Sequence, residues 1–440
     1  MIFDLLKPGI YIKRWILLMI VCILFISASL SKSIDVFNFT VVLQLPVRII
    51  LFIAGILLFF FSVLGLMKGF IKLLNKSLPF RISQKTIFDA IYSKGFLEKG
   101  PRIVAIGGGT GLSTMLRGIK NLTANVTAIV TVADDGGGSG KLREDLGMLP
   151  PGDIRNCILA LANTEEIMQN LLNYRFKEGS LKGQSFGNLF LAAMTGIAGS
   201  FEKAIKLMSE VLAVRGKVLP VTLENINLCA ELDDGSVVVG ESKIPEVVKE
   251  KKGKIKRVFI VPQDAKPYSE VLEEIEKADV IIIGPGSLYT SIMPNLVFEQ
   301  VVESIKKSKA KKIYIANIMT QPGETDDYTL YEHVSAIEKH CKGKIFDIII
   351  VNKQPVPPDI LKRYQEDGAK PIFADRKTKE SGYTLIEEEL LSISNGLVRH
   401  NSTKLAKVIS NILYGKNVMH DYKLGYLKLK SFSKPFRGSL

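Results

Sequence analysis

The stretch Arg102–Gly111, RIVAIGGGTG, decides the fold class. Arg102–Ile106 predicts a short buried strand, and Leu112–Lys120 predicts a helix directly after the glycines. Glycines at such a junction let backbone N–H groups approach an anion, and the helix N-terminus adds partial positive charge. We therefore expect ligand binding here, with a tight turn without ligand as the alternative. The candidate residues are Gly107, Gly108, Gly109, Thr110 and Gly111.

This loop differs from two well-known phosphate-binding patterns. No Gly-Lys-Ser/Thr follows it, so it is not a P-loop. Leu112 occupies the third glycine position of the dinucleotide fingerprint G-x-G-x-x-G. The sequence therefore disfavours an NAD-type oxidoreductase.

Further apolar segments predict a parallel sheet with helices on both faces. Strands are expected at Val126–Val132, Val280–Ile283, Ile313–Ile318 and Ile345–Val351, with a helix near Val297–Lys307. The stretch 218–262 differs, because Cys229–Leu232 and Val237–Val239 flank a glycine-containing turn. We predict an α/β fold with a parallel sheet covered on both faces and an antiparallel β insertion.

A second glycine-rich loop, Asp134–Gly140, follows the second predicted strand. Four glycines beside two carboxylates are costly to order, which favours function over a purely structural role. Asp134 or Asp135 is expected to hold a ribose hydroxyl, to ligate Mg²⁺, or to act as a general base, and the sequence does not choose among these roles. The candidate residues here are Asp134, Asp135, Gly136, Gly137, Gly138 and Ser139.

Three more segments extend the candidate site. In PPGDIRN (150–156), Asp153 is expected to cap a helix and Arg155 to face a phosphate, with an ordinary capped helix as the alternative. FGNL (186–189) enters another helix, and polar loops follow the strands at Val280–Ile283 and Ile313–Ile318, where they should converge. The candidate residues are Gly152, Asp153, Arg155, Asn156, Gly187, Asn188, Gly284, Gly286, Ser287, Tyr289, Thr290, Asn317, Thr320, Gln321, Glu324 and Thr325.

Two apolar runs near the N-terminus, at about 15–31 and 47–67, predict a pair of membrane-spanning helices. Basic residues precede the first run and follow the second, so both ends should face the cytoplasm. We expect a membrane hairpin over 1–80, a linker over 81–100, a ligand-binding domain over 101–415 and a basic tail over 416–440. The alternative is a signal peptide in the first run, with Ser27–Ser29 as its cleavage site.

The net charge of +14 is not spread over the predicted domain. Residues 1–100 carry +8, residues 422–440 carry +5, and residues 101–421 carry only +1. This distribution suits contact with anionic lipid and disfavours a nucleic-acid-binding domain. The four cysteines and four histidines form no metal-ligand spacing, so a zinc site is not expected.

The ordered motifs IGGGTGLS, VTVADDGGGSG, LPPGDIRN, FGNL, RGKVLP, IIIGPGSLYTS, NIMTQPGET and LVRHN resemble the gluconeogenesis-factor family over roughly 101–415. That family is related to the 2-phospho-L-lactate transferases. The resemblance implies a Rossmann-like three-layer α/β fold. It also implies binding of the nucleotide sugar UDP-N-acetylglucosamine and a role in cell shape and cell-wall synthesis during gluconeogenic growth. It also implies that the loop from Asp134 to Gly140 corresponds to an active-site loop that works with a divalent metal in the transferases. Many members lack the N-terminal hairpin.

Two functions therefore stand side by side. A regulator that binds a nucleotide sugar needs no nucleophile, and the motifs offer none. A Mg²⁺-dependent transferase of a phospho-organic acid would use Asp134 and Asp135 as catalytic residues. Homo-oligomerisation and contacts with cell-wall synthesis proteins are expected partners of the first function.

Overall fold

The computed structural model describes residues 13–31, 33–36, 39–42, 44–77, 95, 97–163, 166–394 and 396–415. Contacts divide the chain into two compact units, Met1–Gly95 and Phe96–Leu440. Most of the expected linker and all of the expected tail, 416–440, lie outside the described residues.

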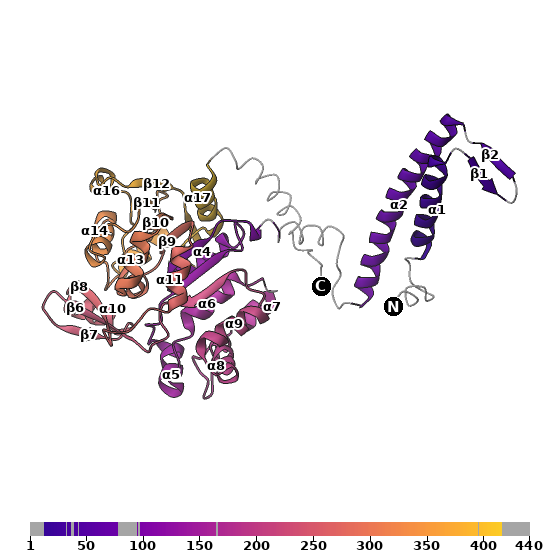
Figure 1. The fold of residues 1–440 in the computed structure, drawn as a ribbon. Helices are drawn as coiled ribbons and strands as arrows, with labels where there is room; N and C mark the ends of the chain where they lie inside the picture. The colour runs from indigo at the N-terminus through magenta and orange to yellow at the C-terminus, as the bar shows by residue number, and fades with distance from the viewer. Residues whose placement is uncertain are drawn as a thin grey trace. The chain divides into compact units, whose positions relative to one another are not determined.

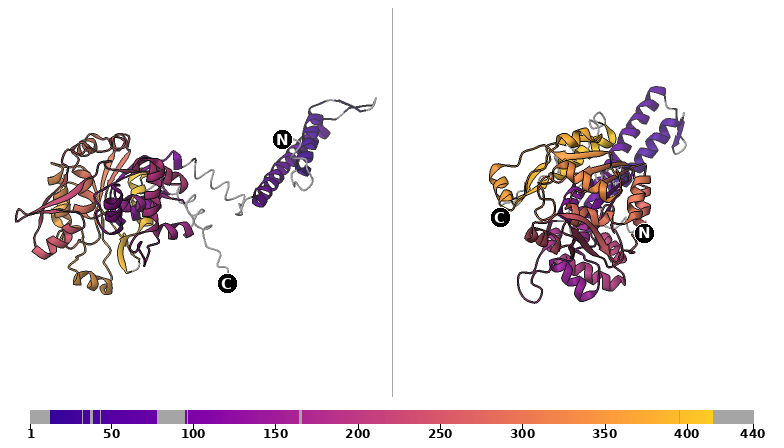
Figure 2. Two further views of the ribbon diagram at one scale, coloured as in Figure 1. Left: turned by 90° about the horizontal axis from the view of Figure 1, so that it is seen from below. Right: turned by 90° about the vertical axis from the view of Figure 1, so that its left-hand side faces the viewer.

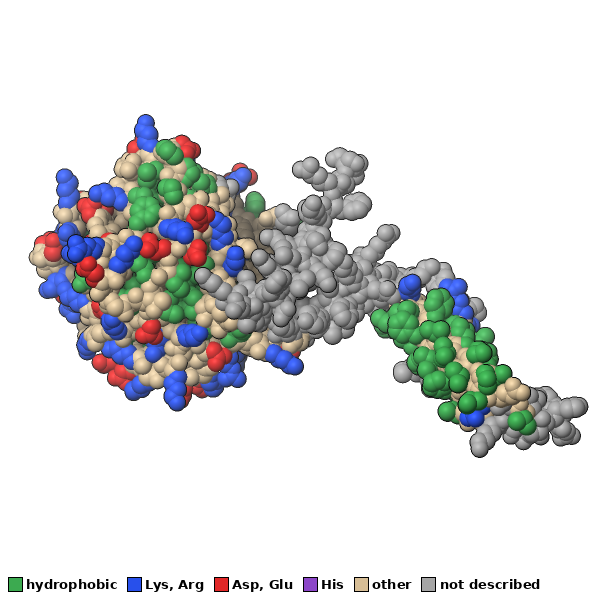
Figure 3. Space-filling model, turned by 90° about the horizontal axis from the view of Figure 1, so that it is seen from above, with side chains coloured by type: hydrophobic (Ala, Val, Ile, Leu, Met, Phe, Trp, Pro, Cys, Tyr) green, Lys and Arg blue, Asp and Glu red, His purple; other side chains and the backbone are tan. Residues whose placement is uncertain are grey.

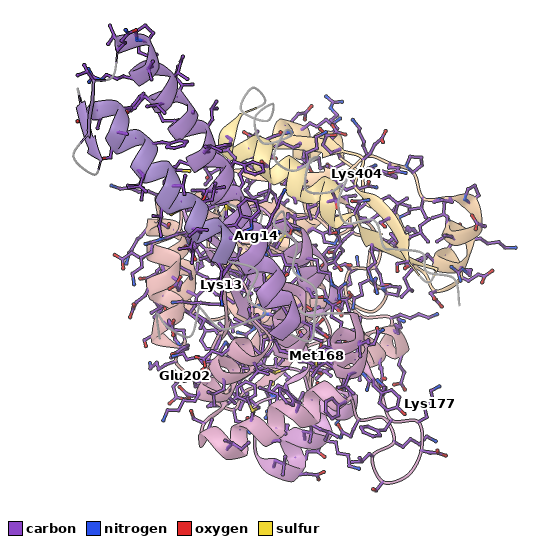
Figure 4. The ribbon with its side chains drawn as sticks, turned by 90° about the vertical axis from the view of Figure 1, so that its right-hand side faces the viewer. Lys13, Arg14, Met168, Lys177, Glu202 and Lys404 are labelled. Atoms are coloured by element: carbon purple, nitrogen blue, oxygen red, sulfur yellow. The ribbon has the colours of Figure 1, made fainter. Side chains whose placement is uncertain are left out.

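The first unit is a pair of apolar helices. α1 (Lys13–Leu30) packs against α2 (Leu45–Ser77), and the short strands β1 (Ser33–Val36) and β2 (Phe39–Val42) pair antiparallel between them. Glycines allow the close approach: a Cβ on Gly65 would lie 2.1 Å from the Trp15 ring. Lys13 and Arg14 begin α1 (Figure 4).

Both helices are long and apolar enough to cross a membrane, over Lys13–Leu30 and Leu45–Phe70. The visible face of the helix pair is largely hydrophobic, whereas the visible face of the second unit mixes cations and carboxylates (Figure 3). The membrane-spanning assignment of α1 and α2 rests on their length and composition. A signal sequence would satisfy the same criteria.

The second unit is built on a seven-stranded parallel sheet, as the sequence predicted (Figure 1). The strand order is β12-β11-β10-β9-β3-β4-β5, and every neighbouring pair is parallel. Its strands are β3 (Ile103–Gly107), β4 (Val126–Val130), β5 (Lys217–Pro220), β9 (Val280–Ile283), β10 (Lys311–Ile315), β11 (Ile348–Asn352) and β12 (Thr384–Glu388).

Helices cover both faces of this sheet (Figures 1 and 2). The chain moves outward from β3 to β4 and β5, then returns to β9 and moves outward in the opposite direction. Since parallel crossovers are right-handed, this reversal places the two sets of helices on opposite faces. The helices are α4 (Gly109–Ile119), α5 (Gly137–Leu146), α6 (Gly152–Leu161), α7 (Glu166–Asn173), α8 (Phe186–Ala198), α9 (Phe201–Val211), α10 (Lys243–Lys251), α11 (Ser269–Glu276), η2 (Leu288–Ile292), α12 (Met293–Leu296), α13 (Glu299–Lys307), α14 (Leu330–His340), α15 (Pro358–Glu366), α16 (Arg376–Glu380) and α17 (Ser402–Tyr414).

The predicted antiparallel insertion is confirmed. β6 (Asn227–Leu232), β7 (Val237–Val239) and β8 (Ile255–Val261) form a three-stranded sheet of order β7-β6-β8. The insertion starts later than residue 218, because Val218 lies in β5 at the edge of the main sheet. A last hairpin, β13 (Leu391–Ser394) with β14 (Leu397–His400), precedes α17.

The core is one continuous apolar cluster around the central strands. β3, β4 and β9 are buried at every position, which explains their unbroken Ile/Val/Ala runs. A smaller cluster under β13 and β14 includes Leu391 and Val398. The packed core fixes the carboxyl ends of the strands, where the polar loops begin.

Candidate functional site

Four polar loops meet at the carboxyl ends of the neighbouring strands β10, β9, β3 and β4. The strand order reverses between β3 and β9, and ligands of open α/β sheets bind at such switch points. The expected convergence of the loops after β9 and β10 is confirmed by paired contacts between Gly286 and Asn317.

A cavity of about 580 Å³, here called the main cavity, lies at this edge of the sheet. That volume lies within the range of small-molecule sites. The sequence-predicted residues in its lining are Gly108, Gly109, Thr110, Gly111, Gly286, Ser287, Asn317, Thr320 and Gln321.

Close backbone packing shapes the main cavity. The Asn317 amide nitrogen donates to the Gly286 carbonyl at 2.8 Å, and its amide oxygen accepts from the Gly286 N–H at 3.1 Å. A Cβ on Gly111 would lie 2.5 Å from the Pro285 carbonyl oxygen. The first turn of α4 therefore meets the β9 loop only because residue 111 is glycine.

Glu324 links the loop after β9 to the loop after β10. Its fully buried carboxylate accepts from the Tyr289 N–H at 3.2 Å, the Thr290 hydroxyl at 2.9 Å and the Gln321 amide at 2.6 Å. Burial raises the pKa of Glu324 to about 7. The structure thus places Tyr289, Thr290 and Glu324 as supports behind the cavity wall.

A smaller polar cavity of about 190 Å³ adjoins the main cavity. The Gly109 N–H, in the main cavity, donates to the Asp153 carboxylate of the polar cavity at 2.6 Å. The sequence-predicted residues in the polar cavity are Asp134, Gly136, Gly137, Gly138, Ser139, Gly152, Asp153, Arg155, Asn156 and Asn188.

Asp153 does not cap α6, so that expectation is wrong. The N-cap position is Pro151, and Asp153 lies inside the first turn. Its carboxylate reaches instead across the site to the Gly109 N–H. This contact joins the N-terminal turns of α4 and α6.

Asp134, Asp153 and Glu241 form an acidic group beside the two cavities. Burial, and then repulsion from Asp134 and other acids, raises the pKa of Glu241 to about 8. Burial raises the pKa of Asp153 to about 6 and also raises that of Asp134. Desolvated carboxylates that repel one another hold protons or attract a cation.

Two buried polar atoms of the polar cavity have no hydrogen-bond partner among the described residues. They are the Arg155 Nε and the Asn188 Oδ1. Arg155 is otherwise fixed, since its guanidinium donates to Ser185 at 2.5 Å and to Asn156 at 2.6 Å. Buried polar groups are nearly always paired, so these atoms suit an ordered water or a polar ligand.

Asp135 has a different position from Asp134. Its carboxylate accepts from the Ser242 N–H at 2.9 Å and lies against Gly240, where a Cβ would approach it to 2.5 Å. Asp135 therefore fixes the turn between β7 and α10, which carries Glu241.

The remaining predicted residues lie near the cavities without lining them. Gly284 has a left-handed φ of +79°, and Thr325 accepts from the Gln321 N–H at 2.9 Å. A Cβ on Gly187 would lie 2.6 Å from the Arg155 side chain. Gly107 ends β3 and is buried.

Sequence reasoning missed Glu241, whose charge acts on the acids of the polar cavity, and several residues that line the cavities. Glu241 comes from the insertion, and Arg175 lies in the loop between α7 and α8. Tyr364, Arg399 and His400 line the main cavity. For Arg399 and His400, the signal available in the sequence was their position at the end of a short apolar strand.

The acidic group can supply oxygen ligands, which Mg²⁺ prefers. Within the described ranges, no three Asp, Glu, His or Cys side chains come together as a ready metal site. Mg²⁺ commonly uses one or two carboxylates and completes its shell with water and substrate phosphates. Asp134 and Asp153 fit that mode.

Comparison with known proteins gives the family. Residues 103–391 match the family described as 2-phospho-L-lactate transferase CofD. A putative gluconeogenesis factor of Clostridium acetobutylicum is 49% identical over 422 residues, 96% of this chain and 94% of that protein. The Bacillus subtilis gluconeogenesis factor is 47% identical over 315 residues, 71% of this chain and 98% of that protein.

A solved structure supports the fold of the second unit. The crystal structure of a Bacillus halodurans protein of the UPF0052 family has 48% identity and a TM-score of 0.67, and the match covers 70% of this chain and 98% of that one. A unit of this kind therefore folds without the N-terminal helices. The fold, the converging loops and these matches together show that the chain belongs to the CofD family and is a relative of the proteins named gluconeogenesis factor.

Proposed function

We propose that the second unit binds a nucleotide sugar, UDP-N-acetylglucosamine, and regulates cell shape and cell-wall synthesis during growth on gluconeogenic carbon sources. The observation that carries this proposal is the pair of adjoining cavities of about 580 and 190 Å³ at the switch point of the sheet. An elongated ligand with a nucleotide end and a small polar end matches such a pair.

The main cavity suits the nucleotide. Gly109, Thr110 and Gly111 form the first turn of α4, and although the Gly109 N–H is taken by Asp153, the other N–H groups of this turn and the helix dipole favour a diphosphate. Tyr364 and Arg399, also in the lining, offer an aromatic ring and a cation.

The polar cavity suits the sugar. Asn188 and Arg155 have unsatisfied buried polar atoms there, and Asn156 lies beside them. Hydroxyl and acetamido groups of a hexosamine would pair with these atoms and so remove their desolvation cost. No chemical step is required for a regulator of this kind.

We further propose that α1 and α2 anchor the protein in the cell membrane, with the second unit in the cytoplasm. Basic residues at the start of α1 and after the apolar part of α2 support this orientation. Proteins of cell-wall synthesis would then be partners at the inner membrane face.

A second candidate function rests on the acidic group. Asp134 and Asp153 line the polar cavity, the charge of Glu241 interacts with both, and each of the three has a raised pKa. Such a group would suit Mg²⁺ with a phosphate-bearing donor, as in transfer of a phospho-organic acid to a hydroxyl acceptor. Bound Mg²⁺ would supply charge neutralisation, and Arg155 would orient an anionic substrate group.

Thermal unfolding of the Phe96–Leu440 unit with nucleotides and nucleotide sugars, with and without Mg²⁺, tests both functions. A ligand at 100 times its dissociation constant stabilises the native state by about 2.7 kcal/mol. Selective stabilisation by UDP-N-acetylglucosamine without turnover supports the regulator. Stabilisation that requires Mg²⁺ and a nucleoside-linked phospho-acid, followed by product formation, supports the transferase, and no stabilisation by either class rejects both.

A further inference from the structure

A third cavity, of about 620 Å³, adjoins the main cavity and the polar cavity. Its lining comes from α4, α6, the end of α7, the β13–β14 hairpin and the start of α17. It shares Arg399 and His400 with the main cavity and Asn156 with the polar cavity. Neither of the functions proposed above assigns a ligand to this space.

Close packing of α17 against α4 forms one wall of the third cavity (Figure 1). A Cβ on Gly118 would lie 2.2 Å from the Ser402 carbonyl oxygen, so the start of α17 reaches α4 only because residue 118 is glycine. This approach places Ser402 and Thr403, in the first turn of α17, in the lining. The N–H groups of such a turn have no partner within the helix, and the helix dipole adds partial positive charge there.

The charged side chains of the third cavity are cations. Among the described residues that line it, the charged ones are Arg117 and Arg399, and none is an aspartate or a glutamate. Within the described ranges, Arg117 has no ion pair, and the Arg399 guanidinium donates to the carbonyl oxygen of its neighbour Val398 at 3.1 Å. Guanidinium groups that lack a carboxylate partner are suited to bind a phosphate.

Further cations lie beside Arg117. The Lys120 ammonium donates to the Ala162 carbonyl at 2.7 Å. Burial, and then repulsion from Arg215 and Arg117, lowers the pKa of Lys120. This side of α4 therefore holds positive charge in excess, which favours a doubly charged anion, such as a phosphate monoester, over a singly charged one.

The uncharged groups of the third cavity suit a ligand with several hydroxyl groups. Serine and threonine make up half of its lining. Burial lowers the pKa of His400 to about 4, so its ring is neutral, and one ring nitrogen is bonded to the Ala316 backbone. The His400 Nε2 has no partner among the described residues and can accept from a ligand hydroxyl. Asn156 accepts from Arg155 through its amide oxygen at 2.6 Å, which leaves its amide nitrogen to donate to the ligand.

We propose that the third cavity binds the phosphate monoester of a small sugar or polyol, as a ligand separate from the nucleotide sugar. Arg117, Arg399 and the first turn of α17 would hold the phosphate, and His400 and Asn156 would pair with hydroxyl groups. The site does not depend on the proposed nucleotide-sugar function, because Arg117 and the first turn of α17 lie outside the linings of the main and polar cavities.

The test is titration calorimetry of the Phe96–Leu440 unit with glucose 6-phosphate, ribose 5-phosphate and sorbitol 6-phosphate. At least one of these should bind at millimolar concentration or below, and sorbitol and inorganic phosphate should each bind at least tenfold more weakly. The sugar phosphate should still bind when UDP-N-acetylglucosamine is present in excess. No binding of any of the three esters, equal binding of inorganic phosphate, or complete displacement by UDP-N-acetylglucosamine overturns the proposal. A failure of UDP-N-acetylglucosamine to bind would count against the nucleotide-sugar function alone.

Two matched pairs of substitutions locate the binding. Arg117→Gln removes a cation from the lining and should weaken binding at least fivefold, whereas Lys407→Gln removes an exposed cation of α17 outside the lining and should not. Asn173→Trp places a large ring in the third cavity, and Asn170→Trp places it one turn earlier on α7, outside the lining. Only the first of this pair should abolish binding. Circular dichroism confirms that each variant is folded, and equal effects within either pair would overturn the proposal.

Discussion

Substitution of Glu241 by glutamine should change how stability depends on pH. Burial and the surrounding acids raise the pKa of Glu241 from an ordinary 4.5 to about 8. A raised pKa means that the folded state holds the proton more tightly than the unfolded state does. Its contribution to stability is therefore complete below about pH 4.5 and is lost as the pH rises through about 8.

The size of the effect follows from proton linkage. When the folded state binds one more proton than the unfolded state, the free energy of unfolding changes by at most about 1.4 kcal/mol per pH unit. Glu241 is only partly buried by exposed area, and water screens part of the repulsion. We therefore expect the stability of Glu241→Gln relative to the wild type to rise by about 1–2 kcal/mol between pH 5 and pH 9.

Urea unfolding of the Phe96–Leu440 unit in chelator, followed by circular dichroism, measures this difference. Tryptophan fluorescence is unsuitable because the single tryptophan, Trp15, belongs to the first unit. Glu246→Gln, in the first turn of α10, removes a carboxylate from the same segment outside the acidic group and serves as control. If the stability of Glu241→Gln relative to the wild type stays constant or falls as the pH rises from 5 to 9, the reasoning is refuted.

Three further outcomes follow from the site. Mg²⁺ should raise the melting temperature of the wild-type unit more at pH 8 than at pH 6, since only ionised carboxylates bind the cation; an equal shift at both values would contradict this. Gly111→Ala should destabilise the unit by about 1–3 kcal/mol in urea, because the new Cβ would lie 2.5 Å from the Pro285 carbonyl oxygen. Glu324→Gln should cost about 1–3 kcal/mol in the same assay by leaving a loop N–H or hydroxyl without its acceptor, and should weaken ligand binding further by loosening the loops behind the main cavity.

Much of the fold could be predicted because the central strands carry local signals. Arg102–Ile106 and Val280–Ile283 are short, apolar and followed by glycine, and both are strands of the sheet. Strand ends were less accurate: Ile313–Ile318 was expected, and β10 runs over Lys311–Ile315. A strand ends where its neighbours end, and the neighbours of β10 are distant in sequence.

The edge strands gave weaker signals. β12, TLIEE, is half-exposed, and β5 ends in Pro220, so neither has the apolar run of a central strand. Edge positions tolerate proline and charge because one side has no ladder to maintain. Local pattern therefore identified the middle of the sheet better than its margins.

The residues of the candidate site could likewise be predicted only in part. The residues expected from glycine-rich loops, such as Gly109 and Asp134, do line the cavities. Glu241 and Arg399 were missed because they enter from the insertion and from the last hairpin, and their approach depends on tertiary packing. The spacing of residues along the sequence carries no information about such tertiary contacts.

The two adjacent aspartates show what the fold adds to the motif. As a sequence, Asp134 and Asp135 were equivalent candidates for ribose binding, metal binding or catalysis. In the structure Asp134 faces the polar cavity, while Asp135 holds the turn that presents Glu241. Loss of function in Asp135→Asn would therefore not show that Asp135 touches the ligand, because the same loss follows from displacement of Glu241. A comparison with Asp134→Asn and Glu241→Gln is needed to separate contact with the ligand from placement of Glu241. The results of that comparison would be interpreted in the same way for a regulator and for a transferase.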